Sequence, residues 1–299
     1  MTIPADSASP FAASTTWRAR RRRGIDRGMR GSATLAAIGS VAVLIWVILD
    51  VALKGASAIN GDFFTKAPPV FGTGGGILPE IVGTGVIVAL ATGFALPIGV
   101  LVAVFLSEFA SPRLAYPIRL ALDLLNGLPS IVIGVFVYGL LVLGSGQKGY
   151  AASIALAIIM VPLIARATQE VLRLVPQAQR DASHALGMST WRTTLGVVLP
   201  ACISGILTGT VLAVARAAGE TAPLLLLSSF YNPNQPVTFN LFGQAIPNIP
   251  MEIFNDAEQP DLASHARGWG AALVLVTIIL LVNLIARYAL ARQRRRMYR

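Results

Sequence analysis

The sequence has few of the residues on which disulfide-bonded domains, zinc proteins and ordinary soluble domains depend. One cysteine, Cys202, and two histidines occur among its 299 residues. A single cysteine excludes a disulfide framework, and so few sulfur and imidazole groups do not make a zinc site, so we expect no metal. Only 13% of the residues are charged, whereas a soluble domain has about a quarter. Because 55% are hydrophobic, an intrinsically disordered chain is excluded as well.

Six apolar stretches are long enough to cross a bilayer. A membrane helix needs roughly 20 apolar residues, and the longest uncharged run, 81–107, has 27. These stretches are apolar on every face, which favours helices over the alternating strands of a membrane barrel. The sequence therefore predicts an all-α integral membrane protein with six transmembrane helices. They lie near residues 31–50, 80–108, 124–146, 149–169, 201–228 and 268–288.

The basic residues lie mainly on one side of this topology. Six spans place both termini on the same side, which holds 19 Lys and Arg residues against four on the other side. Lys and Arg mark the cytoplasmic side of a membrane protein. We therefore expect a membrane protein with both termini in the cytoplasm. Residues 1–30 are expected to be a disordered basic tail, and 293–299 a second basic tail. The net charge of +10 then reflects the concentration of basic residues on the cytoplasmic side. Because membrane orientation explains this charge, we expect no nucleic-acid binding.

Two connections on the opposite side are rich in turn-forming residues. The first, residues 51–79, contains a Pro-Pro pair and three consecutive glycines, and reads as an irregular loop. The last, residues 229–267, holds five prolines and four acidic residues. We expect an external partner to dock there, with an unpatterned loop as the alternative.

The connection at residues 170–200 has helix signals instead. Pro176 suits the start of a helix, and residues 177–186 form an amphipathic pattern. Gly187 is placed to end that helix, and Ser189 or Thr190 can cap the next one. Two short helices on the inner face of the membrane are expected, with Pro200 opening the fifth span.

This connection resembles the EAA loop of ABC-importer permeases, whose pattern is E-A-A, three residues, G, nine residues, I-x-L-P. All spacings match, with Asp181, Ser183 and Val197 in place of Glu, Ala and Ile. The resemblance implies the type I importer permease fold, with a six-span domain over residues 31–292. It also implies that the short helix seats in a cleft of a separate ATPase. The alternative is a generic interfacial helix-turn-helix. The matching coupling positions are Asp181, Ala182, Ser183, Gly187, Leu199 and Pro200.

Two charges interrupt the apolar fifth span. A charge at the bilayer centre costs on the order of 3 kcal/mol, so Arg216 and Glu220 are a functional hypothesis. Their i, i+4 spacing allows them to pair on one helix face, which also carries Gly205 and Gly209. Small residues at this spacing let a neighbouring helix approach closely. The pair would either bind an oxyanion through the arginine fork or simply lock two helices together.

A second resemblance concerns the substrate. Residues 215–225, with the run Gly-Glu-Thr-Ala-Pro, resemble the fifth-span signature of phosphate-importer permeases of the PstA family, and residues 126–134 resemble another permease segment. The resemblance implies a role in phosphate translocation for Arg216 and Glu220. Arg166 matches a basic position of the family, although an arginine at a span end can also simply snorkel.

The same resemblance implies partners. They are a PstC-like permease, a PstB-like ATPase dimer that binds ATP and Mg, and a PstS-like phosphate-binding protein. The glycine-rich runs at 72–76 and 144–149 lack the Gly-Lys-Ser/Thr ending of a phosphate-binding loop. We therefore expect a non-catalytic subunit without a cofactor of its own.

Three other functions remain open at this point. The first is a permease for another oxyanion, such as phosphonate or sulfate. The second is an ion-coupled secondary carrier, which predicts broken helices and an internal repeat. The third is a membrane scaffold or phosphate sensor that does not transport.

Overall fold

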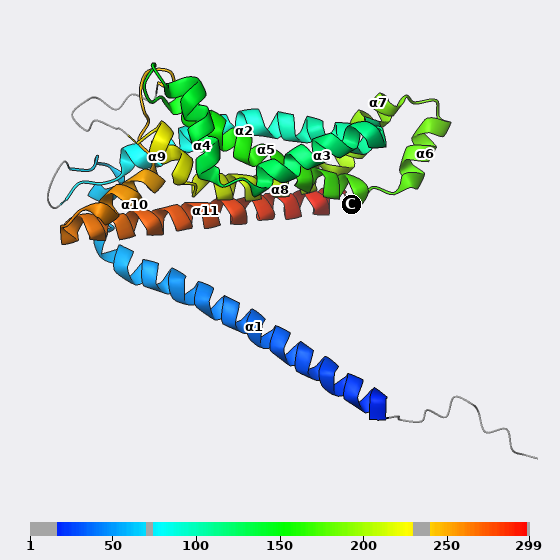
Figure 1. Cartoon of the computed structure of the whole chain (residues 1–299), viewed down its shortest axis with the longest axis horizontal. Coiled ribbons are helices and arrows are strands. Elements are labelled where there is room, and N and C mark those ends of the chain that lie inside the picture. The colour runs from blue at the N-terminus through cyan, green and yellow to red at the C-terminus, as the bar shows by residue number, and fades with distance from the viewer. Residues whose placement is uncertain (1–16, 70–73, 230–239, 298–299) are drawn as a thin grey trace, which may run out of the picture. The chain divides into compact units, whose positions relative to one another are not determined.

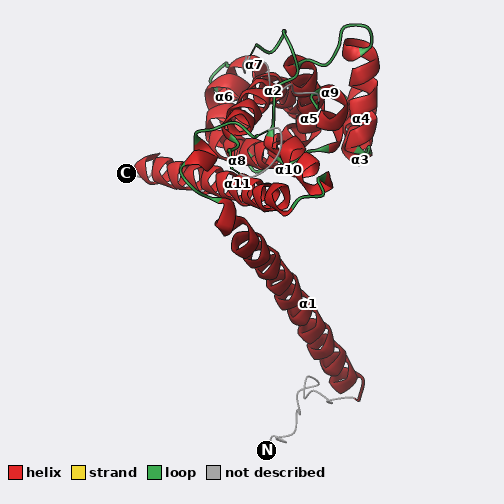
Figure 2. Ribbon diagram, turned by 90° about the vertical axis from the view of Figure 1, so that its left-hand side faces the viewer, coloured by secondary structure: helices red, strands yellow, loops and turns green. Residues whose placement is uncertain are grey.

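The computed structural model describes residues 17–69, 74–229 and 240–297 (Figure 1). Within those ranges every regular element is a helix, and Figure 2 shows no strand among them. The chain divides into two compact units, Met1–Leu53 and Lys54–Arg299. By length and composition, the described residues contain five single helices that suit a membrane, or six spans if one bent helix pair is counted as a span.

The first unit consists of most of helix α1, Trp17–Gly55. Residues 17–30, predicted as part of a disordered tail, are instead helical, which suits the high helix propensity of arginine. Residues 1–16 lie outside the described residues. At the other end of the chain, α11, Leu262–Met297, likewise runs into the predicted second tail.

Three helices form the centre of the second unit. They are α2 (Leu78–Val104), α5 (Gly149–Arg173) and α8 (Leu199–Ala218). The buried face of α2 has small residues at four-residue spacing from Ala91 to Ala103, which allows close approach of the α5 backbone. A Cβ atom on Gly99 would lie 2.9 Å from the Ile164 side chain, for example. This packing makes α5 the most buried candidate span: 67% of its most apolar stretch is buried inside the protein.

The predicted third span, 124–146, is not one straight helix. Helix α3 (Pro112–Gly127) ends there, and α4 (Ser130–Val137) continues at an angle of 101° into a π-helical turn, Tyr138–Val142. The break lies at Leu128 and Pro129, which both have extended backbone angles. A proline disfavours helical conformation in the residue before it, which explains the position of the break.

The predicted fifth span, 201–228, differs from the structure at both ends. Its helix begins at α7 (Thr190–Thr193), passes through a π-helical turn at Thr194–Val198 and continues as α8 to Ala218. Pro200 therefore does not open the span as predicted: it lies inside this continuous helical segment, directly after the π-helical turn. A proline in a helix interior removes one backbone hydrogen bond, and the irregular turn before it is where the helix departs from regular geometry. A separate short helix, α9 (Ala222–Leu227), follows the break.

The connections lie at opposite ends of the second unit. Helix α6 (Gln177–Ala185) and α7 lie at one end, and α9 and α10 (Ile249–Glu258) lie at the other (Figure 1). We call these the α6 end and the α10 end. The predicted irregular loop at 51–79 contains short helical turns at Ala56–Ala58 and Asp62–Phe64, and residues 70–73 lie outside the described residues. The predicted loop at 229–267 contains α10, while residues 230–239 also lie outside the described residues.

Candidate transport and coupling sites

Arg216 lies in α8 just before the break between α8 and α9, and Glu220 lies within that break. Arg216 is in the last turn of α8, whose end is tightened by hydrogen bonds from Gly219 N to Arg216 O (3.1 Å) and from Glu220 N to Ala217 O (3.2 Å). Glu220 therefore lies beyond the end of α8. The prediction that the two residues share one continuous helix face is wrong. They nevertheless form an ion pair, with 3.4 Å between Nε and Oε1.

The ion pair leaves Arg216 accessible to a ligand. The Arg216 side chain is 54% exposed, whereas that of Glu220 is 16% exposed. Within the part of the chain that the structure describes, the contact with Glu220 through Nε is the polar interaction of this guanidinium. Its two terminal amino groups are thus free to donate hydrogen bonds, and a planar fork of this kind suits an oxyanion.

The segment after the break is held in place by neighbouring elements. A Cβ atom on Gly134 of α4 would lie 2.8 Å from the Pro223 Cα atom, so α4 and α9 are in close contact. The Gln147 side chain donates to Leu226 O (2.9 Å) and accepts from Ser229 N (2.9 Å). Helix α4, which follows the break after α3, thus packs against α9, which follows the break after α8. This packing fixes the backbone next to Glu220.

Gly205 and Gly209 lie where α8 crosses α5. A Cβ atom on Gly205 would be 2.5 Å from the Val171 side chain, and one on Gly209 would be 2.4 Å from Ala167 Cβ. The absence of a side chain at both positions therefore permits the close approach of the two helices.

Arg166 lies at a different depth from Arg216. Since Gly209 lies opposite Ala167, the seven residues from Gly209 to Arg216 separate the two arginines by about 10 Å along the helix axis, at 1.5 Å per residue. Arg166 forms an ion pair with Asp123 of α3, and both side chains are about half exposed. They line a pocket of about 130 Å³ at the α6 end that also includes Arg119, Gln169, Glu170 and Arg173. The structure thus brings Arg216 and Glu220 together, but places Arg166 in a separate group.

The helix predicted over 177–186 is present as α6, and Gly187 ends it. Gly187 has a φ of +77°, a conformation that costs other residues energy. Met188 N donates to Ser183 O (3.1 Å) and Gly187 N donates to His184 O (2.9 Å), the paired bonds of a glycine-terminated helix. Ser189 stands at the start of the next helix but makes no side-chain capping bond there.

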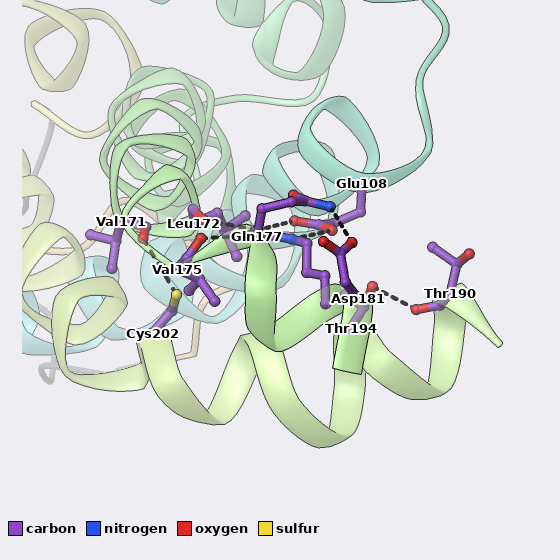
Figure 3. A network of polar contacts seen from close by, with 10 residues as sticks. Glu108, Val171, Leu172, Val175, Gln177, Asp181, Thr190, Thr194 and Cys202 are labelled. Atoms are coloured by element: carbon purple, nitrogen blue, oxygen red, sulfur yellow. Dashed lines mark hydrogen bonds and ion pairs between the residues drawn. The ribbon is translucent and has the colours of Figure 1, made fainter. Parts of the chain in front are cut away.

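A buried ion pair attaches α6 to the end of α2. Arg180 Nη2 and Nε donate to the two carboxylate oxygens of Glu108 at 2.8 and 3.2 Å, in the π-helical turn Phe105–Phe109. Arg180 also donates to the carbonyl oxygens of Val175 (2.7 Å) and Leu172 (3.0 Å), part of the network in Figure 3. The hydrogen-bonded carboxylate raises the pKa of Arg180 above its ordinary value. Sequence reasoning missed this pair, although an acid that ends a long apolar run signals a need for a partner.

The outward face of α6 combines polar and apolar groups. Asp181 and Ala182 are exposed, and Asp181 accepts a hydrogen bond from Gln177 Nε2 (3.1 Å; Figure 3). Leu186 is 83% exposed, a large apolar side chain at the tip of the protein. Ser183 is buried and donates to Gln179 O (3.0 Å). Further along the chain, Leu199 is partly buried and Pro200 is exposed. Asp181, Ala182 and Leu186 thus form the available surface, whereas Ser183 supports the helix from behind.

Among the described residues, no group of three or more His, Cys, Asp or Glu side chains is arranged to hold a metal ion. The exposed guanidinium of Arg216 can bind an oxyanion, and the exposed face of α6 can bind a protein.

Comparison with known proteins gives consistent matches. Residues 95–298 match the family described as "Binding-protein-dependent transport system inner membrane component". The phosphate transport system permease protein PstA of Yersinia pestis is 37% identical over 254 residues, which cover 84% of this chain and 85% of that protein. PstA 1 of Mycobacterium tuberculosis H37Rv is 34% identical over 263 residues, with 84% of each chain covered.

Solved structures match at the level of the fold. A bacterial alginate ABC transporter in complex with a pentasaccharide-bound periplasmic protein aligns with a TM-score of 0.63 and 14% identity, covering 92% of this chain and 96% of that chain. The MetNI methionine ABC transporter, in an inward-facing conformation, aligns with a TM-score of 0.57 and 17% identity. That match covers 72% of this chain and 92% of the other.

Proposed function

The chain belongs to the family of binding-protein-dependent transport system inner membrane components, and from this premise we propose that it is the PstA-type permease subunit of an ATP-driven phosphate importer. It is a multi-pass inner membrane protein with the fold of ABC-importer permeases. Support for phosphate comes from relatives named phosphate transport permeases, which are 34–37% identical over most of both chains. The observation that carries the proposal is the Arg216–Glu220 pair, an accessible guanidinium beside a break in an apolar helix.

We propose that phosphate passes along Arg216. In the free protein Glu220 balances the arginine charge, which lowers the cost of holding it within the membrane. An arriving phosphate oxyanion competes with Glu220 for the guanidinium and binds its terminal amino groups. Arg166, about 10 Å further toward the α6 end by helix rise, would be a second basic position on the way to the cytoplasm.

In this proposal the α6 end faces the cytoplasm, as the distribution of basic residues predicts, and both termini are cytoplasmic. Helix α6 seats in a cleft of a PstB-like ATPase through Asp181, Ala182 and Leu186. The Arg180–Glu108 pair carries the movement of α6 into α2. A PstC-like permease completes the pathway, a PstS-like binding protein delivers phosphate, and the ATPase alone binds ATP and Mg.

The test is ATP-dependent uptake by the four-component complex in proteoliposomes. Radiolabelled phosphate should accumulate inside, and unlabelled phosphate should compete while sulfate and methylphosphonate do not. Competition by sulfate or phosphonate alone would assign another oxyanion. Uptake without the ATPase would favour a secondary carrier, and regulation without uptake would favour a sensor.

A further inference from the structure

A pocket of acidic character lies at the α10 end, away from Arg216 and from α6. Its volume is about 190 Å³, well above the roughly 10–15 Å³ that one water molecule needs by the same measure. Three helices contribute to its lining, the first turn of α2, helix α10 and the start of α11, together with connecting residues at 68–69, 228–229 and 247–248. Its ionisable lining residues are Glu80, Glu252, Asp256, Asp261 and Arg267.

The Arg267 guanidinium pairs with two of these acids. Its Nε atom donates to Asp256 Oδ2 (3.1 Å) and to Glu252 Oε1 (3.3 Å), and its Nη2 atom donates to Asp256 Oδ1. Nη2 also donates to Ser264 Oγ at 3.4 Å. The arginine therefore joins α11 to the two acids of α10, which are one helical turn apart. Among the described residues its ion pairs are with these two acids and not with Glu80.

Glu80 is a third carboxylate, and one of its oxygens is unsatisfied. The residue is 1% exposed, and Oε2 has no hydrogen-bond partner among the described residues although Glu80 lines the pocket. Burial of a carboxylate without a donor is costly, so a group that supplies N–H bonds would be stabilised there. Burial and the adjacent Asp256 raise the pKa of Glu252 to about 7 despite Arg267. The pocket thus holds more carboxyl groups than its single arginine can pair, and a second cation there would favour their ionised forms.

The chemistry of the missing partner follows from these contacts. A metal ion is disfavoured, because no three carboxylates of the described residues are placed to hold one. An ammonium or guanidinium group needs only directed acceptors, and the pocket supplies them in Glu80 Oε2 and the exposed side chain of Asn255.

We propose that this pocket receives one lysine or arginine side chain of the external binding protein when that protein docks on the α10 end. The inference rests on the proposed function, because it takes the α10 end to face outward. Opposite charge across an interface speeds encounter and fixes the register of the two proteins. A cation that enters the pocket also completes the hydrogen bonding of Glu80, so the docked state is favoured over a loosely associated one.

The test measures docking separately from transport. The assembled complex, in nanodiscs, is titrated with the binding protein, and both direct binding and stimulation of ATP hydrolysis are recorded for Glu80→Gln. Loss of a charge-assisted hydrogen bond should weaken binding about tenfold or more, with unstimulated hydrolysis unchanged. The matched control is Glu258→Gln, which removes a carboxylate from an exposed position of α10, outside the pocket but at the same end of the protein.

A second variant covers the case in which Glu80→Gln fails to assemble. Asn255 is exposed at the pocket, so Asn255→Lys places an ammonium group there and should block docking to a similar extent. Wild-type affinity in either assembled variant would overturn the proposal. So would reduced transport at unchanged affinity, which would indicate a free cation or proton at the site. Failure of the wild-type complex to import phosphate would instead refute the proposed function, whatever the affinity measurements show.

Discussion

The guanidinium of Arg180 and the carboxylate of Glu108 form a two-point ion pair between α6 and the end of α2, with nitrogen–oxygen distances of 2.8 and 3.2 Å. The Arg180 side chain is 14% exposed and that of Glu108 is 8% exposed, so water competes little for either group. A planar fork on a carboxylate also fixes orientation. The pair is therefore a rigid link between the surface that would contact the ATPase and a membrane helix.

Arg180→Lys should uncouple the two ends of this link. Lysine keeps the charge but cannot make the parallel bonds to Glu108 while also reaching Leu172 O and Val175 O. Removal of one partner of a buried pair costs about 3 kcal/mol or more, and we expect the milder lysine variant to assemble with hydrolysis retained and phosphate uptake per ATP reduced severalfold. Arg192→Lys, on the exposed surface of α7, is the control. An unchanged ratio of uptake to hydrolysis in Arg180→Lys would refute the link.

Arg216→Gln should abolish phosphate uptake. Glutamine cannot offer a charged fork to the oxyanion, and the change leaves Glu220 as an uncompensated charge. Glu220→Gln should be milder, because Arg216 retains its terminal amino groups. Uptake in proteoliposomes and co-purification of the subunits measure function and assembly. Arg287→Gln, exposed near the end of α11, serves as control, and wild-type uptake by Arg216→Gln would remove this residue from the pathway.

Local signals in the sequence were sufficient for α6. Pro176 sets where this helix begins and Gly187 sets where it ends. Both act through their own backbone preferences, which do not depend on the rest of the fold. The breaks in the third and fifth spans were not predicted, because they depend on packing between distant segments and not on local residue type. Pro97 and Pro162 lie inside α2 and α5, whereas Pro129 and Pro223 stand where helices begin. The same residue type has either outcome, and packing such as that of α4 against α9 decides between them.

The candidate sites divide in the same way. Arg216 and Glu220 are close in sequence, so spacing alone suggested the ion pair, although the helix ends between them. Glu108 and Arg180 are 72 residues apart, and Glu80 is joined to its acidic neighbours only through the packing of α2, α10 and α11. Broken helices were also expected of a secondary carrier. They are present here in a binding-protein-dependent permease, so helix breaks alone do not separate the two classes.

Gly187→Ala should weaken association with the ATPase. The φ of +77° costs an L-residue about 1–2 kcal/mol, and no atom lies within 4 Å of an added Cβ, so the penalty arises from the backbone alone. Gly196→Ala is a matched control, because its added Cβ meets only ordinary contact with Met188 at 3.9 Å. Binding of the ATPase to the purified permease pair measures the effect. Equal affinity in the two variants would count against a role for this turn.

Gly209→Ala should destabilise the crossing of α8 and α5. The added Cβ would lie 2.4 Å from Ala167 Cβ, and overpacking of this kind costs about 1–3 kcal/mol. Gly93→Ala in α2, where nothing lies within 4 Å, should be neutral or slightly stabilising. Thermal unfolding in detergent distinguishes them, and the close crossing is refuted if both variants unfold at the same temperature.

The acidic pocket should make stability depend on pH. The pKa of Glu252 is raised from an ordinary 4.5 to about 7, mainly by burial and then by Asp256. Between those two pH values the folded protein holds a proton that the unfolded chain has released. The free energy of unfolding contributed by this group therefore falls as pH rises from about 4.5 to about 7. Burial also raises the pKa of Asp256, which acts in the same direction.

Glu252→Gln removes the titrating group while keeping its size and one acceptor oxygen for Arg267. The drop in unfolding temperature between pH 5 and pH 8 should therefore be smaller in this variant than in the wild type. Glu258→Gln is exposed on the same helix and should follow the wild type. An equal drop in all three proteins would mean that Glu252 stays ionised throughout. The Arg267 guanidinium would then suffice to balance the pocket, with no need for a proton or a second cation.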